Sequence, residues 1–196
     1  MLKEKIDLFK TAFAAGAFIA LGAVAAVSAG DGMAGAVIFG AGLVSTIVTG
    51  SALYTGRIGY ISKLKELPDL LGVLLCNFAM AIIIGLIFLS WDKPFDMSAR
   101  IDTNMLVVFG KAAVCGMWVY TAVEAYKRTT NVLTIIFPVA AFVISGAEHC
   151  VADAFYITIG RAWSLRAVIW LLVVALGNSV GSLFLRFCVL KPKANK

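Results

Sequence analysis

The hydrophobic positions of this chain gather into six long runs that short polar connections separate. The runs cover residues 11–29, 33–61, 68–91, 105–126, 131–160 and 163–190. A helix needs about 20 apolar residues to cross the roughly 30 Å hydrocarbon layer of a bilayer. The pattern therefore predicts an all-α integral membrane protein with six transmembrane helices, all in a single domain over residues 1–196.

Two of these runs, 33–61 and 131–160, are longer than a straight span requires, and each carries a glycine and polar side chains near its middle. They read "VTGSALYTG" and "ISGAEHCVADAFY" at these places. An interrupted helix leaves backbone N–H and C=O groups without helical partners, and such groups are tolerated inside a membrane only where they line a cavity or are buried in protein. We therefore expect the second and fifth helices to be broken and to meet at a binding or permeation site near the bilayer centre.

The two halves of the chain share glycines and an asparagine at similar spacings. The matched pairs are Gly16 with Gly110, Gly22 with Gly116, Gly50 with Gly146, and Asn77 with Asn178. Three spans per half is an odd number, so the two copies have to lie in the bilayer with opposite orientation. The spacing predicts two inverted three-helix repeats, over residues 11–91 and 105–190, with the two asparagines hydrogen-bonded to the broken segments.

Composition and charge agree with a membrane protein and set its orientation. The sequence is 61 % hydrophobic and 14 % charged, with a mean hydropathy of +0.95, whereas soluble domains are about 45–50 % apolar and 25 % charged. With the N-terminus inside, the inner side holds 12 of the 17 Lys and Arg residues, as cytoplasmic loops do. Both termini are therefore expected in the cytoplasm. The net charge of +6 follows from this topology and does not favour nucleic-acid binding, because no basic stripe with interleaved aromatic residues occurs.

Several features limit the other function classes. The first ten residues, "MLKEKIDLFK", have no small-residue cleavage site and predict a helix that lies on the membrane surface. The four cysteines stand in apolar runs without C-x-x-C spacing, so neither a disulfide framework nor a zinc site is indicated. We expect no cofactor and no metal. An integral-membrane enzyme, or a subunit that does not itself transport, is the competing class.

His149 is the only histidine in the chain and stands beside the expected break in the fifth run. A bare anion at the bilayer centre is costly, so it has to be stabilised or neutralised there. Histidine has an unperturbed pKa of about 6.5 and can hold or release a proton near physiological pH. His149 is predicted either to protonate a passing anion or to polarise it through hydrogen bonds; the alternative is a neutral structural histidine.

Four other polar side chains lie close to the expected breaks. Glu148 is about 100° around the helix from His149 and is expected to anchor the break by accepting backbone N–H bonds. Asp153 follows His149 by four residues on the same helical face, so it could fix the imidazole tautomer; alternatively it is protonated or faces a protomer contact. Ser51 and Thr55 are candidate pore residues, although such side chains also bond their own helix carbonyls.

The fifth run also carries a family resemblance. The stretch "FPVAAFVISGAEHCVADAFYI" resembles the fifth-span signature of the formate/nitrite transporter family, and "FGAGLVSTIVTGSALYTG", "AGAFIALGA" and "GNSVGS" are similar to its other spans. The resemblance covers residues 10–190. It implies a homopentamer with an aquaporin-like fold and one pore per protomer, which passes small monovalent anions or their acids across the bacterial inner membrane.

The resemblance also implies roles for individual residues. His149 matches the central histidine and Thr55 the threonine of the second span. The apolar constrictions fall on Phe39 and Leu43 at the cytoplasmic side and on Leu53, Tyr54 and Phe142 around the middle and outer side. The departures from the usual pattern are Tyr54 in place of Phe, Asp153 in place of Asn, and Ala147 in place of a bulky residue. Asn104 stands near the place of an outer-vestibule lysine, which leaves Arg100 or Lys111 as its substitute.

The sequence does not decide which anion permeates. Formate, nitrite and hydrosulfide are all small and monovalent, and all fit one such pore. Formate is the first expectation because of its frequency in the family. A channel and a proton-coupled transporter both remain compatible with a pore that contains a titrating histidine.

Overall fold

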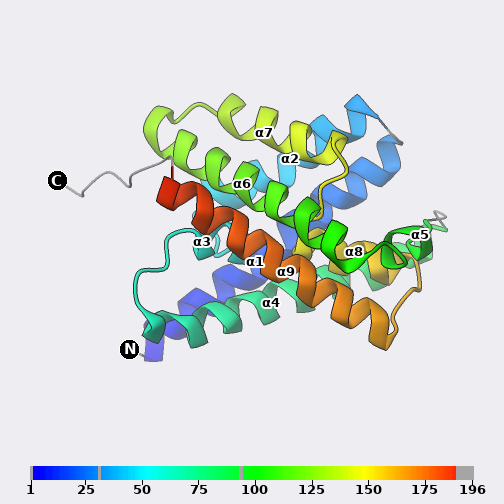
Figure 1. Cartoon of the computed structure of the whole chain (residues 1–196), viewed down its shortest axis with the longest axis horizontal. Coiled ribbons are helices and arrows are strands. Elements are labelled where there is room, and N and C mark those ends of the chain that lie inside the picture. The colour runs from blue at the N-terminus through cyan, green and yellow to red at the C-terminus, as the bar shows by residue number, and fades with distance from the viewer. Residues whose placement is uncertain (1, 31, 93–94, 189–196) are drawn as a thin grey trace.

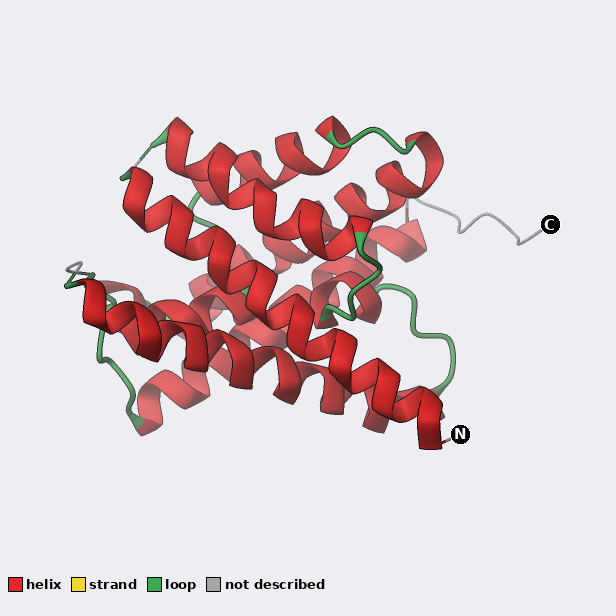
Figure 2. Cartoon of the chain, turned by 180° about the vertical axis from the view of Figure 1, so that it is seen from behind, coloured by secondary structure: helices red, strands yellow, loops and turns green. Residues whose placement is uncertain are grey.

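The computed structural model describes residues 2–30, 32–92 and 95–188, and over these residues the regular structure is helical (Figure 2). The helices are α1 (Leu2–Ala29), α2 (Met33–Val48), α3 (Tyr54–Ile58), α4 (Leu67–Phe88), α5 (Ser98–Ile101), α6 (Met105–Thr129), α7 (Leu133–Ile144), α8 (Cys150–Ile159) and α9 (Leu165–Cys188). Two 3-10 turns, η1 (Leu64–Glu66) and η2 (Leu89–Trp91), extend α4 at its two ends.

Four helical stretches in the described part are long and apolar enough to cross a bilayer. They are α1, the stretch Leu64–Trp91 around α4, α6 and α9. They correspond to the expected spans at 11–29, 68–91, 105–126 and 163–190. The apolar helices α2, α7 and α8 are shorter, with 16, 12 and 10 residues.

The two remaining runs, 33–61 and 131–160, are each divided into two helices. Residues 49–53 separate α2 from α3, and residues 145–149 separate α7 from α8. The cause is the same in both, because Gly50 (φ 69°) and Gly146 (φ 66°) adopt the left-handed conformation that ends a helix. The next residue in each case bonds back to the last turn, from Ser51 N–H to the Thr46 carbonyl and from Ala147 N–H to the Phe142 carbonyl, both at 3.0 Å.

The N-terminal segment corrects one expectation. It does not form a separate surface helix, because α1 runs without interruption from Leu2 to Ala29, and no Gly or Pro stands between Lys10 and Phe13 to end it. Lys5 Nζ lies 2.8 Å from Asp69 Oδ1 at the start of α4. The Phe9 ring also packs over Gly72 of α4. The first turns of α1 are therefore held against α4.

Glycines let the long helices approach closely, as is common between helices in membranes. The backbone of Asn77 in α4 lies against Gly16 in α1, and the backbone of Asn178 in α9 lies against Gly116 in α6. Gly110, by contrast, has no neighbour within 4 Å of the place of a Cβ atom. By this contact Gly16 corresponds to Gly116, so the expected pairings of Gly16 with Gly110 and of Gly22 with Gly116 are both wrong. Glycine is too frequent in such helices for its spacing alone to fix the register.

The arrangement of the helices gives the molecule two distinct ends (Figure 1). The start of α1, the end of α9 and the α3–α4 connection all lie at one end of the molecule, whereas α5 lies at the opposite end. We name these the termini end and the α5 end. In between, α6 packs along α9, α1 against α2 and α4, α2 against α7, and α4 against α8.

Candidate functional site

The breaks before α3 and α8 bring two short segments together in the middle of the molecule. Each segment ends at the residue that begins a helix, Leu53 before α3 and His149 before α8. Both residues are buried, with 2 % and 3 % of their surface exposed. The N-terminal end of α8 carries the partial positive charge of a helix, so this centre favours a negatively charged or hydrogen-bond-accepting group.

Asn77 and Asn178 hold these two segments, as their positions predict. Asn77 Oδ1 accepts a hydrogen bond from Tyr54 N–H (2.8 Å), and its Nδ2 donates to the carbonyls of Ala12 (2.7 Å) and Ala52 (3.0 Å). Asn178 Oδ1 accepts from Cys150 N–H (3.0 Å), and its Nδ2 donates to the carbonyls of Ala112 (2.8 Å) and Glu148 (2.8 Å). Each fully buried amide thereby satisfies backbone groups that the break in a helix frees.

His149 and Thr55 form the polar contact at this centre. His149 Nε2 lies 2.9 Å from Thr55 Oγ1, and His149 Nδ1 lies 3.3 Å from the N–H of Ala152, which donates to it. A neutral imidazole has one donor and one acceptor nitrogen. Because Nδ1 accepts, this pattern assigns the proton to Nε2, which donates to the Thr55 hydroxyl. The Thr55 hydroxyl keeps its own proton for another acceptor.

Glu148 and Asp153 contact Arg100, which follows the α4–α5 connection. One guanidinium nitrogen, Nη2, bonds to Glu148 Oε2 and lies 2.8 Å from Asp153 Oδ1. The two carboxylates are buried, whereas about a third of the Arg100 side chain is exposed. The expected pairing of Asp153 with His149 is therefore corrected, because Asp153 turns to a guanidinium from another part of the chain. Glu148 anchors the break through its carbonyl, and among the described residues its carboxylate accepts hydrogen bonds from the Arg100 guanidinium and not from backbone N–H groups.

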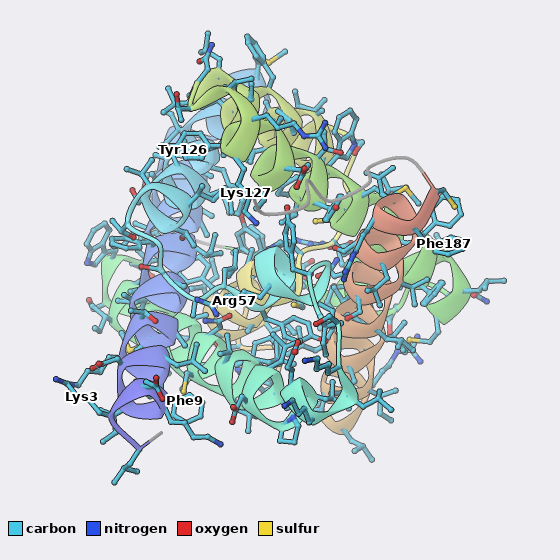
Figure 3. The ribbon with its side chains drawn as sticks, turned by 90° about the vertical axis from the view of Figure 1, so that its left-hand side faces the viewer. Lys3, Phe9, Arg57, Tyr126, Lys127 and Phe187 are labelled. Carbon is cyan, nitrogen blue, oxygen red and sulfur yellow. The ribbon has the colours of Figure 1, made fainter. Side chains whose placement is uncertain are left out.

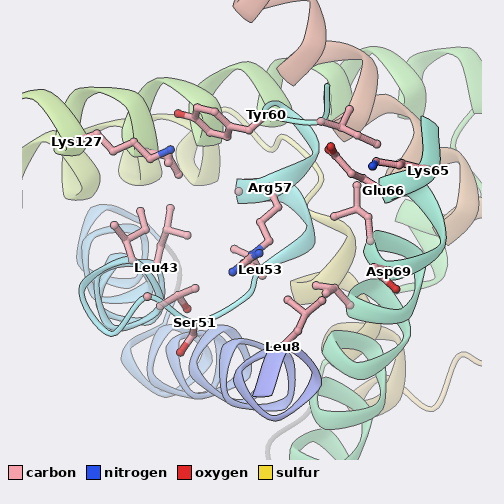
Figure 4. A pocket seen from close by; sticks show the side chains of 18 residues that line it. Leu8, Leu43, Ser51, Leu53, Arg57, Tyr60, Lys65, Glu66, Asp69 and Lys127 are labelled. Atoms are coloured by element: carbon pink, nitrogen blue, oxygen red, sulfur yellow. The ribbon is translucent and has the colours of Figure 1, made fainter. Parts of the chain in front are cut away.

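The predicted apolar residues divide between two cavities. A cavity of about 740 Å³ opens at the termini end, and its walls include Leu43, Leu53 and Ser51 (Figure 4). A second cavity of about 880 Å³ opens at the α5 end, and its walls include Phe39, Phe142, His149, Glu148 and Asp153. Phe39 was expected on the same side as Leu43, and Leu53 with Phe142. The structure instead places Leu53 with Leu43 in the first cavity and Phe39 with Phe142 in the second. Phe39 lies one helical turn before Leu43 in α2 and is therefore closer to the α5 end.

Aromatic rings pack beside His149 in the second cavity. The rings of Phe39 and Phe142 meet edge to face with centroids 6.0 Å apart, and the Phe142 ring stacks on the imidazole at 6.1 Å. The wall farther out is charged and includes Arg100, Lys111 and Asp96. The N–H of Ser98 donates to Asp96 Oδ1 (2.8 Å) and holds the pKa of Asp96 below its usual range. Between Arg100 and Lys111, it is Arg100 that contacts the residues beside His149.

Tyr54 behaves differently from its expected role. Its hydroxyl lies 2.8 Å from Ser179 Oγ in α9, which itself donates to the Ala175 carbonyl at 2.6 Å. Ser179 has a single proton, so the Tyr54 hydroxyl is the donor of this pair. Tyr54 lines neither of the two cavities. Its extra hydroxyl, relative to Phe, therefore fastens α3 to α9.

Two basic residues near the site were not singled out from the sequence. Arg57 in α3 and Lys127 in α6 both line the termini-end cavity (Figures 3 and 4). A signal was available for Arg57, because it follows Thr55 by two residues and stands in an otherwise apolar segment. In the described part of the chain, no group of three or more His, Cys, Asp or Glu side chains has metal-binding geometry.

Long apolar helices around a buried polar centre, with a cavity at either end, define a polytopic helical membrane protein. The chain belongs to the formate/nitrite transporter family, because the sequence model described as "Formate/nitrite transporter" matches residues 2–190. Members of this family are channels and transporters.

Individual relatives agree with this assignment. The chain is 27 % identical to a "Probable formate transporter" of Methanothermobacter thermautotrophicus, over 96 % of this chain and 90 % of the relative. It is also 27 % identical to the "Nitrite transporter NirC" of Escherichia coli, over 93 % and 82 %. Among solved structures, an "FNT family ion channel" superposes with a TM-score of 0.81 at 26 % identity, over 91 % of this chain and 86 % of that one. A "Pentameric formate channel with formate bound" has the same fold, with a TM-score of 0.76 at 21 % identity, over 92 % and 93 %.

Proposed function

We propose that the chain is a channel for a small monovalent anion, with formate as its first substrate. The observation that carries this proposal is the hydrogen bond between His149 Nε2 and Thr55 Oγ1. It leaves the Thr55 hydroxyl proton for an anion between the two cavities, and the imidazole N–H becomes a second donor when it exchanges Thr55 Oγ1 for that anion. Nitrite and hydrosulfide are the alternative substrates, and the nitrite transporter among the relatives supports the first of these.

The proposed path runs between the two cavities through the polar centre. An anion enters the termini-end cavity, passes Leu43 and Leu53, reaches His149 and Thr55, and leaves past Phe39 and Phe142, or moves in the reverse direction. The leucines and phenylalanines exclude water, and the His149 N–H, the Thr55 hydroxyl and the positive end of α8 replace part of the lost hydration. The neutral tautomer favours polarisation of the anion through hydrogen bonds. The alternative mechanism is transfer of a proton from His149 to the anion, after which the neutral acid crosses the apolar constriction.

The proposed architecture has six spans. In it, α2 with α3 and α7 with α8 are the discontinuous second and fifth helices, and the four long helices supply the others. Residues 11–91 and 105–190 are then two inverted three-helix repeats of one domain, in an aquaporin-like arrangement. The matched hydrogen bonds of Asn77 and Asn178 support the repeats, because each asparagine ties the start of a half-helix to the first long helix of its own half.

The proposed assembly is a homopentamer with one pore per protomer, in the bacterial inner membrane and with both termini in the cytoplasm. The pentameric formate channel of the same fold supports the assembly. Exposed apolar side chains along α4 and α9, such as Leu75, Leu86, Leu172 and Phe184, supply surface for lipid and for neighbouring protomers. Labelling of the exposed Cys188 at the end of α9 with a membrane-impermeant maleimide tests the orientation: intact cells should protect it, and inverted vesicles should not.

Uptake by proteoliposomes tests the function. Formate, nitrite and hydrosulfide are compared for the wild type and for His149→Ala between about pH 5 and 8, which brackets the unperturbed histidine pKa. We expect one anion to enter faster than into empty liposomes and His149→Ala to abolish or flatten the pH dependence. Equal passage of all three anions, unchanged by His149→Ala, would make His149 structural and selection a matter of size alone. No uptake above empty liposomes, together with a stoichiometric partner on purification, would indicate a subunit that does not transport by itself.

A further inference from the structure

Arg57 and Lys127 point into the termini-end cavity from two different helices. In Figure 4 the Arg57 guanidinium lies near the middle of the cavity, and the Lys127 ammonium approaches from α6. Among the described residues, no hydrogen bond or ion pair reaches the Arg57 guanidinium, and Lys127 contacts only the face of an aromatic ring. Both cations therefore have hydrogen-bond donors to offer to a molecule that enters.

The carboxylates of the same cavity already have partners. Glu66 accepts hydrogen bonds from the N–H and the hydroxyl of Ser62, both at 3.2 Å. Asp69 pairs with Lys5 at 2.8 Å. In Figure 4 these two acids lie on the α4 side, whereas Lys127 lies on the α6 side. The cavity thus has satisfied acids on one wall and unused cations at its centre and on the opposite wall.

The surroundings of Lys127 fix its position. Its Nζ atom lies 3.4 Å from the centroid of the Tyr60 ring, within the range of a cation–π contact. The Tyr60 hydroxyl donates to Glu124 Oε2 at 2.8 Å, and Arg128 holds Glu124 Oε1 at 2.7 Å. Glu124 therefore attracts Lys127 only through space, and its oxygens bond to Tyr60 and Arg128, so the N–H donors of the Lys127 ammonium remain available to an anion.

We propose that Arg57 and Lys127 form a capture site that binds the anionic substrate at the termini end, before it meets Leu43 and Leu53. A guanidinium presents two parallel N–H donors, which match the two oxygens of a carboxylate and of other planar oxyanions. The substrate class of this site is accordingly a small anion with two oxygens on one atom, as in formate and nitrite. A single-atom anion such as chloride can accept only one of these paired bonds well. This inference rests on the proposed transport function and adds a second point of selection to it.

Kinetics of formate uptake test the capture site. Inverted vesicles that expose the termini end are given radiolabelled formate over a range of concentrations, for the wild type, Arg57→Gln, Arg57→Lys and Lys3→Gln. We expect Arg57→Gln to raise the half-saturating concentration about tenfold, the scale of one charge-assisted hydrogen bond, with the maximal rate retained. Arg57→Lys keeps the positive charge but loses the two parallel N–H donors, so we expect a smaller rise in the half-saturating concentration than in Arg57→Gln.

The matched control is Lys3→Gln, which removes the same charge at the same end of the molecule but outside the cavity (Figure 3). It should leave the half-saturating concentration unchanged. An unchanged value in Arg57→Gln, or an equal rise in Lys3→Gln, would overturn the capture site. Absence of uptake by the wild type is a separate result, because it contradicts the transport function itself.

Competition identifies the class of anion. Nitrite should inhibit formate uptake by the wild type at a concentration at least about tenfold below that of chloride, because only nitrite can take both guanidinium N–H bonds. Arg57→Lys should narrow this difference. Equal inhibition by nitrite and chloride in the wild type would exclude paired recognition by Arg57.

Discussion

Asn77 and Asn178 make the same set of three hydrogen bonds in the two halves of the chain. Each accepts one from the first N–H of a half-helix, that of Tyr54 or Cys150, and donates one to a long helix and one to the break. Both amides are completely buried. Asparagine suits this place because it has both a donor and an acceptor on one short side chain.

Replacing Asn178 by Leu should destabilise the protein by about 2–4 kcal/mol, because it leaves the buried Cys150 N–H and Glu148 carbonyl without a partner and removes the bond to the Ala112 carbonyl of α6. Asn77→Leu should have a loss of the same size. Thermal unfolding of the purified protein in detergent measures both. If either variant unfolded at the wild-type temperature, the asparagine concerned would be dispensable to the break it contacts.

Thr55→Val should lower formate flux about tenfold, since it replaces the hydroxyl by a methyl group of similar shape and removes a hydrogen bond of about 1 kcal/mol and a donor to the anion. Thr55→Ser keeps the hydroxyl and is the matched control. Flux into proteoliposomes is the measurement. Wild-type flux through Thr55→Val would show that His149 acts without this partner.

Arg100→Gln should destabilise the protein by about 3 kcal/mol at neutral pH, because it leaves two buried carboxylates without their cation. Adding Asp153→Asn to Arg100→Gln should recover part of the loss, since one of the two negative charges disappears. A double variant no more stable than Arg100→Gln at pH 7, as judged by thermal unfolding, would contradict this account.

Two glycines of α6 should respond in opposite ways to alanine. Gly116→Ala should cost about 1–3 kcal/mol, because its methyl group would overlap the backbone of Asn178. Gly110→Ala meets no neighbour and should stabilise the helix by up to about 1 kcal/mol. Comparison of their melting temperatures tests the packing of α6 on α9, and equal values would argue against it.

Tyr54→Phe should cost about 1 kcal/mol of stability, the value of one buried hydrogen bond. It should leave the preference among anions unchanged, because the hydroxyl points to Ser179 and away from both cavities. Ser179→Ala should have the same small effect, and combining the two should add little, since they share one bond. A changed preference among anions in Tyr54→Phe would show that the Tyr54 side chain does line the pore.

The features that the sequence predicted are those that local pattern controls. Long apolar runs gave the four long helices, and glycines in the two longest runs marked where α2 and α7 end. The asparagines were recognised because buried polar groups in a membrane need partners.

What the sequence did not predict depends on contacts between distant segments. Arg100 is 53 positions from Asp153, and no helical periodicity relates a residue in α5 to one in α8. The same holds for the side on which Phe39 and Leu53 lie, which depends on how α2 crosses α7. The sequence analysis paired Asp153 with His149 because it considered only residues on the same helix.

The two breaks offer equivalent backbone places that hold different side chains. Leu53 and His149 both precede the first turn of a half-helix, but only the second has a side chain that can bond an anion. At this equivalent place the second half thus carries a side chain with hydrogen-bonding nitrogens and the first half carries an apolar one, although their supporting asparagines are alike. For protein engineering, position 53 is therefore a second place for a histidine, because its backbone already has the extended conformation that His149 adopts before α8.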